Sequence, residues 1–267
     1  RYCRKYPDRI RIVLNRHNIR ARRTIVRGYQ ACRGQYMTLT DGDDYWTSPD
    51  KLQRQADFLD GHPDCTVCFH SVTNVWDDGS HEPTLCRPSQ VQEMYTLFDI
   101  LDYNFIPACS VMYRRGVFPQ HPAWFFLPPV GDWPQHILHA HFGKIGYIDE
   151  PMAAYRLHAG GVHSMRPREQ TLGVDIKTRI ILRQVLEKKY RSALTVSLIH
   201  QYAMLAQEHR QRGNRPALRA CVRDCLLDCS SNFFRPDLSL VKMLVHVYLA
   251  GPYGRLRSLV HGRPGAA

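Results

Sequence analysis

Three aspartates within four residues are the strongest candidates for chemistry in this sequence. Asp41, Asp43 and Asp44 surround Gly42 and follow directly on residues 35–40, a predicted strand. Carboxylates this close repel one another unless a positive charge lies between them. Hard divalent cations such as Mg²⁺ and Mn²⁺ take oxygen ligands from carboxylates and from substrate phosphates. The spacing therefore indicates a metal site. The alternative is a solvent-exposed turn, because Asp and Gly are common turn residues.

The aspartates lie between a predicted strand and a predicted helix. A strand over residues 35–40 would place them at its carboxyl end, the edge at which open α/β sheets bind ligands. Ser48 is the expected cap of the helix that follows, and Pro49 is its expected first residue. An apolar stripe at helical spacing should face the core; it consists of Leu52, Ala56 and Leu59.

Alternating strands and helices in the first part of the chain predict an α/β domain. Further strands are expected over residues 10–14, 65–70, 106–113, 146–148 and 153–156. Helices are expected over residues 21–32 and 132–141. Beyond the first 165 residues the pattern is helical only, with helices expected over residues 168–188, 190–212, 215–230 and 237–250. We therefore expect an α/β domain over residues 1–165 and a helical region over residues 166–267.

The charge and the cysteine content limit the class of protein. A net charge of +12 favours anionic partners, but no nucleic-acid-binding module is recognisable, so we expect no nucleic acid partner. Nine cysteines without a paired framework are typical of a reduced, intracellular protein. No apolar run is long enough to span a bilayer, and the N-terminus does not resemble a signal peptide. These features together predict a cytoplasmic protein.

One cysteine motif could bind a metal. Cys65 and Cys68 are two residues apart, and His70 follows them. A structural zinc site needs four ligands, usually from two such pairs, and no second pair lies nearby. We therefore expect these residues to belong to a buried strand.

Two segments of the chain resemble bacterial family 2 glycosyltransferases of the GT-A fold. The first is Gly34–Gln53, which contains the aspartates in the arrangement Asp-x-Asp. The second is on the acceptor side and comprises Gly131–Pro134 and Gly143–His158. The similarity extends over roughly residues 8–165. It implies a Rossmann-like mixed sheet and the transfer of a sugar from a nucleotide-diphosphate sugar to an acceptor hydroxyl, with inversion of the anomeric centre.

The resemblance implies a donor site that depends on Mn²⁺ or Mg²⁺. Asp43 matches the residue that contacts the metal directly. Asp41 matches a residue that touches the ribose or reaches the metal through water, and Asp44 would assist or hold the loop. His158 matches a histidine that contacts the metal or the diphosphate in some relatives, although a lone histidine is often structural.

On the acceptor side, Asp132 matches the catalytic base. The alternative from local sequence is that Asp132 only caps a helix. Trp133 is expected either to stack on a sugar ring or to pack in the core. Arg156 is expected to pair with a phosphate or with a carboxylate such as Asp149.

The sequence also departs from the family pattern. The resemblance implies that about the first quarter of the catalytic domain, which binds the base, is missing before Arg1. Residues 15–20 depart from the usual Asn-x-Gly pattern. Two further hypotheses therefore stay open. One is a non-catalytic binding or scaffold protein built on a truncated GT-A domain. The other is a metal-dependent nucleotidyltransferase, although no phosphate-binding Gly-rich loop is visible.

The acceptor expected from the resemblance is a carbohydrate or a lipid-linked glycan, in the synthesis of surface polysaccharide. Residues 238–250 are strongly apolar and are followed by Arg255, Arg257 and Arg263. An apolar helix with basic flanks can lie on an anionic membrane surface, and the alternative is packing in a core. The first interpretation would place the protein at the inner face of the membrane.

Overall fold

The computed structural model describes residues 2–161 and 166–230, and the chain divides into two compact units, Arg1–Met165 and Arg166–Ala267. The helices of unit 1 are α1 (Tyr2–Lys5), α2 (Arg20–Ala31), α3 (Lys51–Gly61), α4 (Leu97–Asp102) and α5 (Asp132–Ala140), with 3₁₀ helices η1 (Ala108–Ser110) and η2 (Ala123–Phe126). The strands are β1 (Tyr36–Thr38), β2 (Tyr45–Trp46), β3 (Cys65–Trp76), β4 (Thr84–Cys86), β5 (Met94–Tyr95), β6 (Met112–Arg114) and β7 (Lys144–Leu157).

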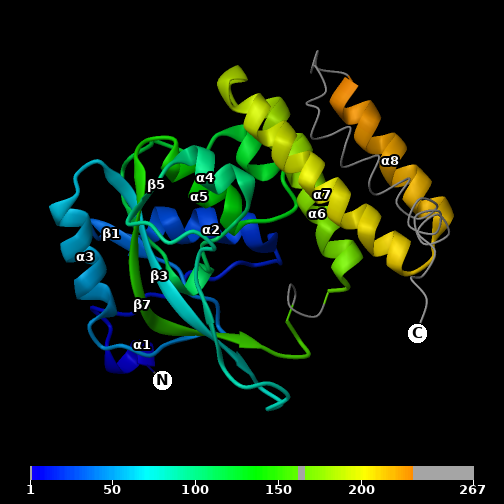
Figure 1. Ribbon diagram of the computed structural model, residues 1–267. Helices are drawn as coiled ribbons and strands as arrows, with labels where there is room; N and C mark the ends of the chain where they lie inside the picture. Colours follow the sequence, from blue (N-terminus) through cyan, green and yellow to red (C-terminus); the bar gives the residue numbers. More distant parts are fainter. Residues whose placement is uncertain (1, 162–165, 231–267) are drawn as a thin grey trace, which may run out of the picture. The chain divides into compact units, whose positions relative to one another are not determined.

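The strands of unit 1 form one mixed sheet in the order β1-β6-β3-β7-β2, with β4 paired to β3 and β5 paired to β7. The two longest strands, β3 and β7, run parallel and side by side through the unit (Figure 1). Every other strand pair in the described residues is antiparallel. This mixed sheet with helices confirms the expected α/β class.

Helices α3 and α5 cover opposite faces of the sheet. Successive side chains of a strand point to opposite faces, and two neighbours on β6 show this clearly. Met112 packs in a cluster with Leu59 of α3. The Tyr113 hydroxyl lies 2.6 Å from Nδ1 of His136, which belongs to α5. The core therefore has two layers, one on each side of the sheet.

The cysteine motif belongs to the α3 layer. Cys65 and Cys68 are buried on β3 and pack with Leu59 and Met112. The Cys65 thiol lies 3.4 Å from the sulfur of Met94. These contacts confirm the interpretation as a buried strand.

Two sequence expectations about strands need correction. Residues 10–14 contain no strand, and Leu14 is 80% exposed. The described residues provide no strand that hydrogen-bonds to this segment, and apolar composition alone does not form a sheet. The strand expected over residues 106–113 is only β6, preceded by a 3₁₀ turn. The two short strands expected after residue 145 are one continuous strand, β7.

The orientation of α3 also differs from the expected one. The helix starts at Lys51, two residues after Pro49, and Leu52 is 42% exposed. Its buried residues are Lys51, Gln55 and Leu59, so of the expected stripe Leu59 is buried, Ala56 is half-buried and Leu52 faces solvent. The Lys51 ammonium donates to the Gln55 side chain at 2.7 Å and lies 4.5 Å from the centre of the Trp46 ring. Burial lowers the pKa of Lys51 to about 8.

Unit 2 contains α6 (Arg168–Val185), η3 (Lys188–Tyr190), α7 (Arg191–Gln211) and α8 (Arg215–Ser230), which confirms three of the expected helices. Helix α7 packs against both α6 and α8. The buried contacts include Ile176, Leu198, Tyr202, Cys221 and Cys225. The expected helix over residues 237–250, and with it the proposed membrane-contacting segment, lies outside the described residues.

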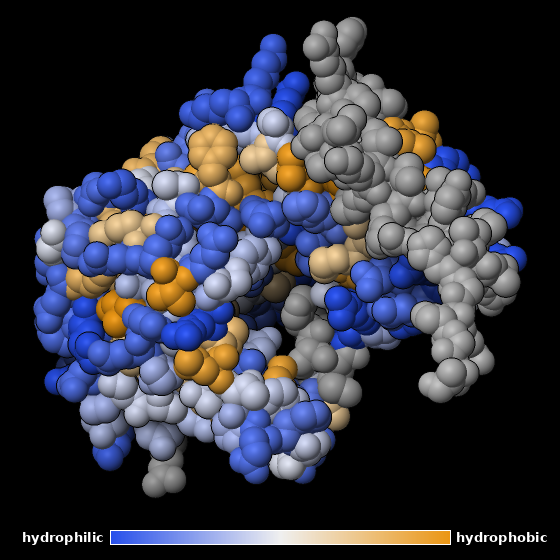
Figure 2. Space-filling view, in the orientation of Figure 1, coloured by the Kyte–Doolittle hydropathy of each residue, from blue (hydrophilic) through white to orange (hydrophobic). Residues whose placement is uncertain are grey.

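Hydrophilic side chains predominate on the visible face of unit 1, and the hydrophobic side chains there form scattered patches (Figure 2). None of the described helices is both long enough and apolar enough to cross a membrane.

The sheet is closely covered at Gly146 of β7. A methyl group added there would overlap the ring of Phe58, which extends from α3. We therefore expect Gly146→Ala to lower the free energy of unfolding by about 1–3 kcal/mol, because the ring must move out of a packed layer. Urea denaturation followed by circular dichroism measures this.

The matched control is Gly28→Ala in α2, where an added methyl group meets no atom within 4 Å. That change should stabilise the fold by roughly 0.5–1 kcal/mol, since alanine favours a helix interior more than glycine does. Equal stabilities of Gly146→Ala and the wild type would contradict the packing described.

Candidate active site

The three aspartates form a tight turn after β1, here called the acid turn (residues 41–44). The Asp44 amide donates to the Asp41 carbonyl at 3.3 Å, which closes the turn. Carboxylate oxygens of Asp41, Asp43 and Asp44 lie within 4.8 Å of one another. Among the described residues, 2–161 and 166–230, these aspartates are the cluster of three or more possible ligand side chains that could hold a metal ion.

The electrostatics of the acid turn favour a bound cation. The pKa of Asp41 is raised, first by partial burial of its carboxyl group and then by the charges of Asp43, Asp44 and Asp132. Burial also raises the pKa of Asp44, against the effect of a backbone hydrogen bond from Arg156. Carboxylates held in this way carry unbalanced negative charge, and a divalent cation among them would relieve the repulsion. The carboxylate oxygens of the acid turn therefore suit Mn²⁺ or Mg²⁺ as ligands.

His158 lies beside the acid turn although it is 115 positions away in the sequence. Its Nε2 is 3.0 Å from Oδ2 of Asp43, and this hydrogen bond is the main reason why the pKa of Asp43 is lowered. An imidazole at this position can coordinate a metal or orient the carboxylate that does.

The pairing of β2 with β7 brings these residues together. Tyr45 and Trp46, which follow the acid turn, pair with Ala154 and Ala153 of β7. One Asp44 oxygen accepts the backbone N–H of Arg156 at 3.0 Å. The end of β7, which leads to His158, is thereby held against the turn.

Asp132 is the first residue of α5. Its charge contributes to the raised pKa of Asp41, after burial and the charges of Asp43 and Asp44. The Asn104 side-chain amide donates to Asp132 at 2.9 Å. The N-cap position of α5 is Gly131, and no side chain caps the helix. The interpretation of Asp132 as only a helix cap is therefore wrong.

The structure corrects the expectation for Trp133. Its indole is only 2% exposed, and its N–H donates to the Ile100 carbonyl at 2.7 Å. A ring enclosed in the core offers no face to a sugar, so core packing is the correct one of the two expected roles.

The carboxylate partner of Arg156 also differs from the expected one. The Arg156 guanidinium donates to Asp77 at 2.9 and 2.5 Å, whereas Asp149 is paired with Arg87. The positive charge of Arg156 still contributes to the lowered pKa of Asp43.

Two further residues of the site had no assigned role in the sequence. Tyr155 of β7 packs beside Cys109 and Ala153, and burial followed by the charges of Asp44 and Asp132 raises its pKa to about 12. Asn104 holds Asp132 from the loop after α4. Nothing in the local sequence marks either residue, because residues 153–156 show no polar–apolar alternation and Asn104 lies in a loop.

Part of the chain is similar to known proteins. Residues 1–121 match the model of the family described as glycosyl transferase family 2. Three curated relatives are each 38% identical over 165 residues, which is 60% of this chain and 46% of the relative. They are the uncharacterized proteins Mb1547 of Mycobacterium bovis and MT1570 and Rv1520 of two Mycobacterium tuberculosis strains. The matched part of the chain thus spans less than half the length of these relatives.

The repulsion among the carboxylates of the acid turn should lower the free energy of unfolding of the metal-free protein. We expect Asp41→Asn to stabilise the metal-free protein by up to about 1 kcal/mol, because it removes one of the mutually repelling charges. The same change should reduce the rise in melting temperature that Mn²⁺ causes in the wild type. Thermal unfolding with and without Mn²⁺ measures both effects.

Asp8→Asn is the matched control, since Asp8 is an exposed aspartate outside the acid turn. It should leave the response to Mn²⁺ unchanged. A metal-free Asp41→Asn variant less stable than the wild type would show that repulsion among the three carboxylates does not destabilise the turn.

Proposed function

We propose that this chain transfers a sugar from a nucleotide-diphosphate sugar to an acceptor hydroxyl. The premise is that residues 1–121 form a family 2 glycosyltransferase domain with a GT-A-like α/β fold. The observation that carries the proposal is that His158, which is 115 positions from Asp43 in sequence, lies 3.0 Å from its carboxylate within a cluster of three aspartates. The charge of Asp132 also acts on this cluster, since it contributes to the raised pKa of Asp41.

Asp43 is the proposed direct metal ligand, with Asp41 beside it. His158 either coordinates the metal itself or holds Asp43 in place for it. A bound Mn²⁺ or Mg²⁺ would neutralise the negative charge that develops on the departing diphosphate. His158 holds one oxygen of Asp43 at 3.0 Å, which leaves the other oxygen for coordination. Asp44 is tied to the Arg156 backbone, so its proposed role is to fix the turn and not to move with substrate.

Asp132 is the proposed base that takes the proton of the acceptor hydroxyl. Asn104 donates to one oxygen of Asp132 and so fixes the plane of the carboxyl group. The other oxygen is left to accept the proton of the acceptor. A single base on the acceptor side is sufficient for one direct displacement, which inverts the anomeric centre. The proposed acceptor is a carbohydrate or a lipid-linked glycan of surface polysaccharide synthesis.

Arg156 is available to a substrate phosphate only if it exchanges its contact with Asp77. Its side chain is 36% exposed, so a diphosphate could approach it from solvent. A guanidinium can hold two oxygens of either partner in the same geometry. We therefore propose that Arg156 contacts the donor diphosphate when the donor is bound.

Metal-dependent donor binding tests the first part of the proposal. UDP and GDP should bind more tightly with Mn²⁺ than without it, and Asp43→Ala should remove that difference because the direct ligand is lost. Isothermal titration calorimetry of the 267-residue chain measures both. Asp57→Ala, on the exposed surface of α3, is the control and should bind as the wild type does. Full metal-dependent binding by Asp43→Ala would remove its role as a ligand.

Asp132→Asn tests the second part. The amide keeps an oxygen for Asn104 but cannot take a proton, so UDP or GDP should bind unchanged. Turnover should fall by at least about 100-fold, the usual contribution of a general base. The release of nucleotide from UDP-sugars and GDP-sugars, with an acceptor present, measures turnover. Equal turnover by variant and wild type would exclude Asp132 as the base.

A further inference from the structure

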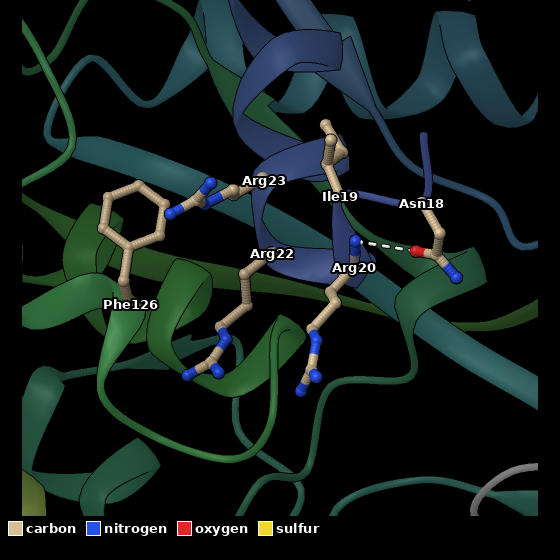
Figure 3. Close-up of a pocket in the computed structure, with 6 residues that line it drawn as sticks. All are labelled: Asn18, Ile19, Arg20, Arg22, Arg23 and Phe126. Carbon is tan, nitrogen blue, oxygen red and sulfur yellow. Dashed lines mark hydrogen bonds between the residues drawn. The ribbon is translucent and has the colours of Figure 1, made fainter. Parts of the chain in front are cut away.

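A basic pocket lies at the start of α2, next to the loop that leads to Asp132. Its volume is about 410 Å³. It is lined by Asn18, Ile19, Arg20, Arg22, Arg23 and Phe126 (Figure 3). The side chains of Arg20 and Arg22 extend side by side, and Arg23 extends toward the ring of Phe126.

This pocket is here called the arginine pocket. Its three arginines occupy an unfavourable place on the helix. The N-terminus of a helix carries partial positive charge, which favours acidic side chains and disfavours basic ones. The first turn of α2 contains no acidic residue, and its N-cap residue, Ile19, makes no side-chain cap hydrogen bond. Within residues 2–161 and 166–230, no carboxylate is paired with any of these three arginines. The local charge is therefore unbalanced, as it is in the acid turn but with the opposite sign.

Arg22 is the most confined of the three. Its Nη1 is buried and has no hydrogen-bond partner in the described residues. Burial and then the charge of Arg20 lower its pKa. Buried donors of a guanidinium are normally satisfied, so an unsatisfied one beside a cavity indicates the place of an acceptor group.

The backbone holds the pocket in one shape. Arg20 has a φ of 66°, a left-handed conformation that is rare for a residue with a side chain. The Asn18 side chain accepts the Arg20 amide at 2.8 Å and stabilises this bend. The arginines are thus presented by a fixed bend and not by a free loop.

The pocket adjoins the proposed acceptor side of the site. A methyl group added at Gly131 would lie 3.6 Å from Cγ of Arg22 and 3.1 Å from the side chain of Ile25. Gly131 directly precedes Asp132, so the stem of Arg22 packs against the loop that carries the proposed base.

We propose that the arginine pocket binds a phosphate group of a substrate, at a site separate from the acid turn. Guanidinium groups hold phosphate oxygens through pairs of charge-assisted hydrogen bonds, and the N-terminus of α2 adds its own positive potential. That the bound phosphate belongs to a substrate rests on the proposed glycosyl transfer. That the pocket binds an anion does not depend on it. The phosphate belongs either to the nucleotide donor or to a phosphorylated or lipid-phosphate-linked acceptor.

Titration with inorganic pyrophosphate in the absence of metal tests the site. The 267-residue chain should bind it, and both Arg22→Gln and Arg23→Gln should weaken binding by at least about tenfold, since each removes a charge-assisted contact. Rising NaCl should weaken binding in the wild type because salt screens the attraction. Arg23→Gln covers the case in which Arg22→Gln disturbs the packing on Gly131.

Two controls separate this site from other basic surface and from the acid turn. Arg33→Gln removes an exposed arginine outside the pocket and should bind as the wild type does. Asp43→Ala should also bind normally, since the anion site does not use the acid turn. A folded wild type that binds no pyrophosphate, or an equal loss in Arg33→Gln or in Asp43→Ala, would overturn the proposal.

A competition experiment with Mn²⁺ and UDP or GDP identifies the source of the phosphate. Displacement of pyrophosphate from the pocket by the nucleotide, together with weaker nucleotide binding by Arg22→Gln, assigns the pocket to the donor. Simultaneous binding, with glycerol phosphate displacing the pyrophosphate, assigns it to a phosphorylated acceptor. A chain that binds pyrophosphate through the arginines but transfers no sugar would contradict the proposed function and support the anion site.

Discussion

The hydrogen bonding of β7 is the interaction on which the structure of unit 1 depends. This strand runs parallel to β3 through the centre of the sheet and pairs on its other side with the short strand β2. Because β2 follows the acid turn directly, the pairing places the turn beside the end of β7, where Tyr155 and His158 lie. The centre of the fold and the proposed metal site thus share one strand, and a change in its register would move both.

Two groups of like charges are left unbalanced by the rest of this unit. The acid turn collects negative charge, which adds to the effect of burial in raising the pKa of Asp41. The arginine pocket collects positive charge at the positive end of a helix. A folded chain tolerates such groups only at a cost in stability, and sites of function are where natural proteins accept it. A metal–diphosphate donor and a further phosphate would together supply the missing charges.

Two buried polar residues of α3 have a structural role. Lys51 and Gln55 join α3 to the sheet, with Gln55 donating to the carbonyls of Cys68 and Ser110 at 3.0 and 2.8 Å. The Lys51 ammonium lies over Trp46 of β2, so it supports the strand that follows the acid turn. Buried polar groups satisfied in this way define one arrangement of helix and sheet.

The sequence by itself determined the features that depend on neighbours along the chain. The acid turn after β1, the helix that starts at Asp132 and the change to helices after residue 165 all follow from local spacing and residue type. Only the tertiary structure decided which face of each element is buried. It placed Lys51 and Trp133 in the core, left residues 10–14 without a strand and brought His158 to Asp43 across 115 positions. The physical reason is that burial and strand pairing are set by non-local contacts, to which short-range periodicity is insensitive.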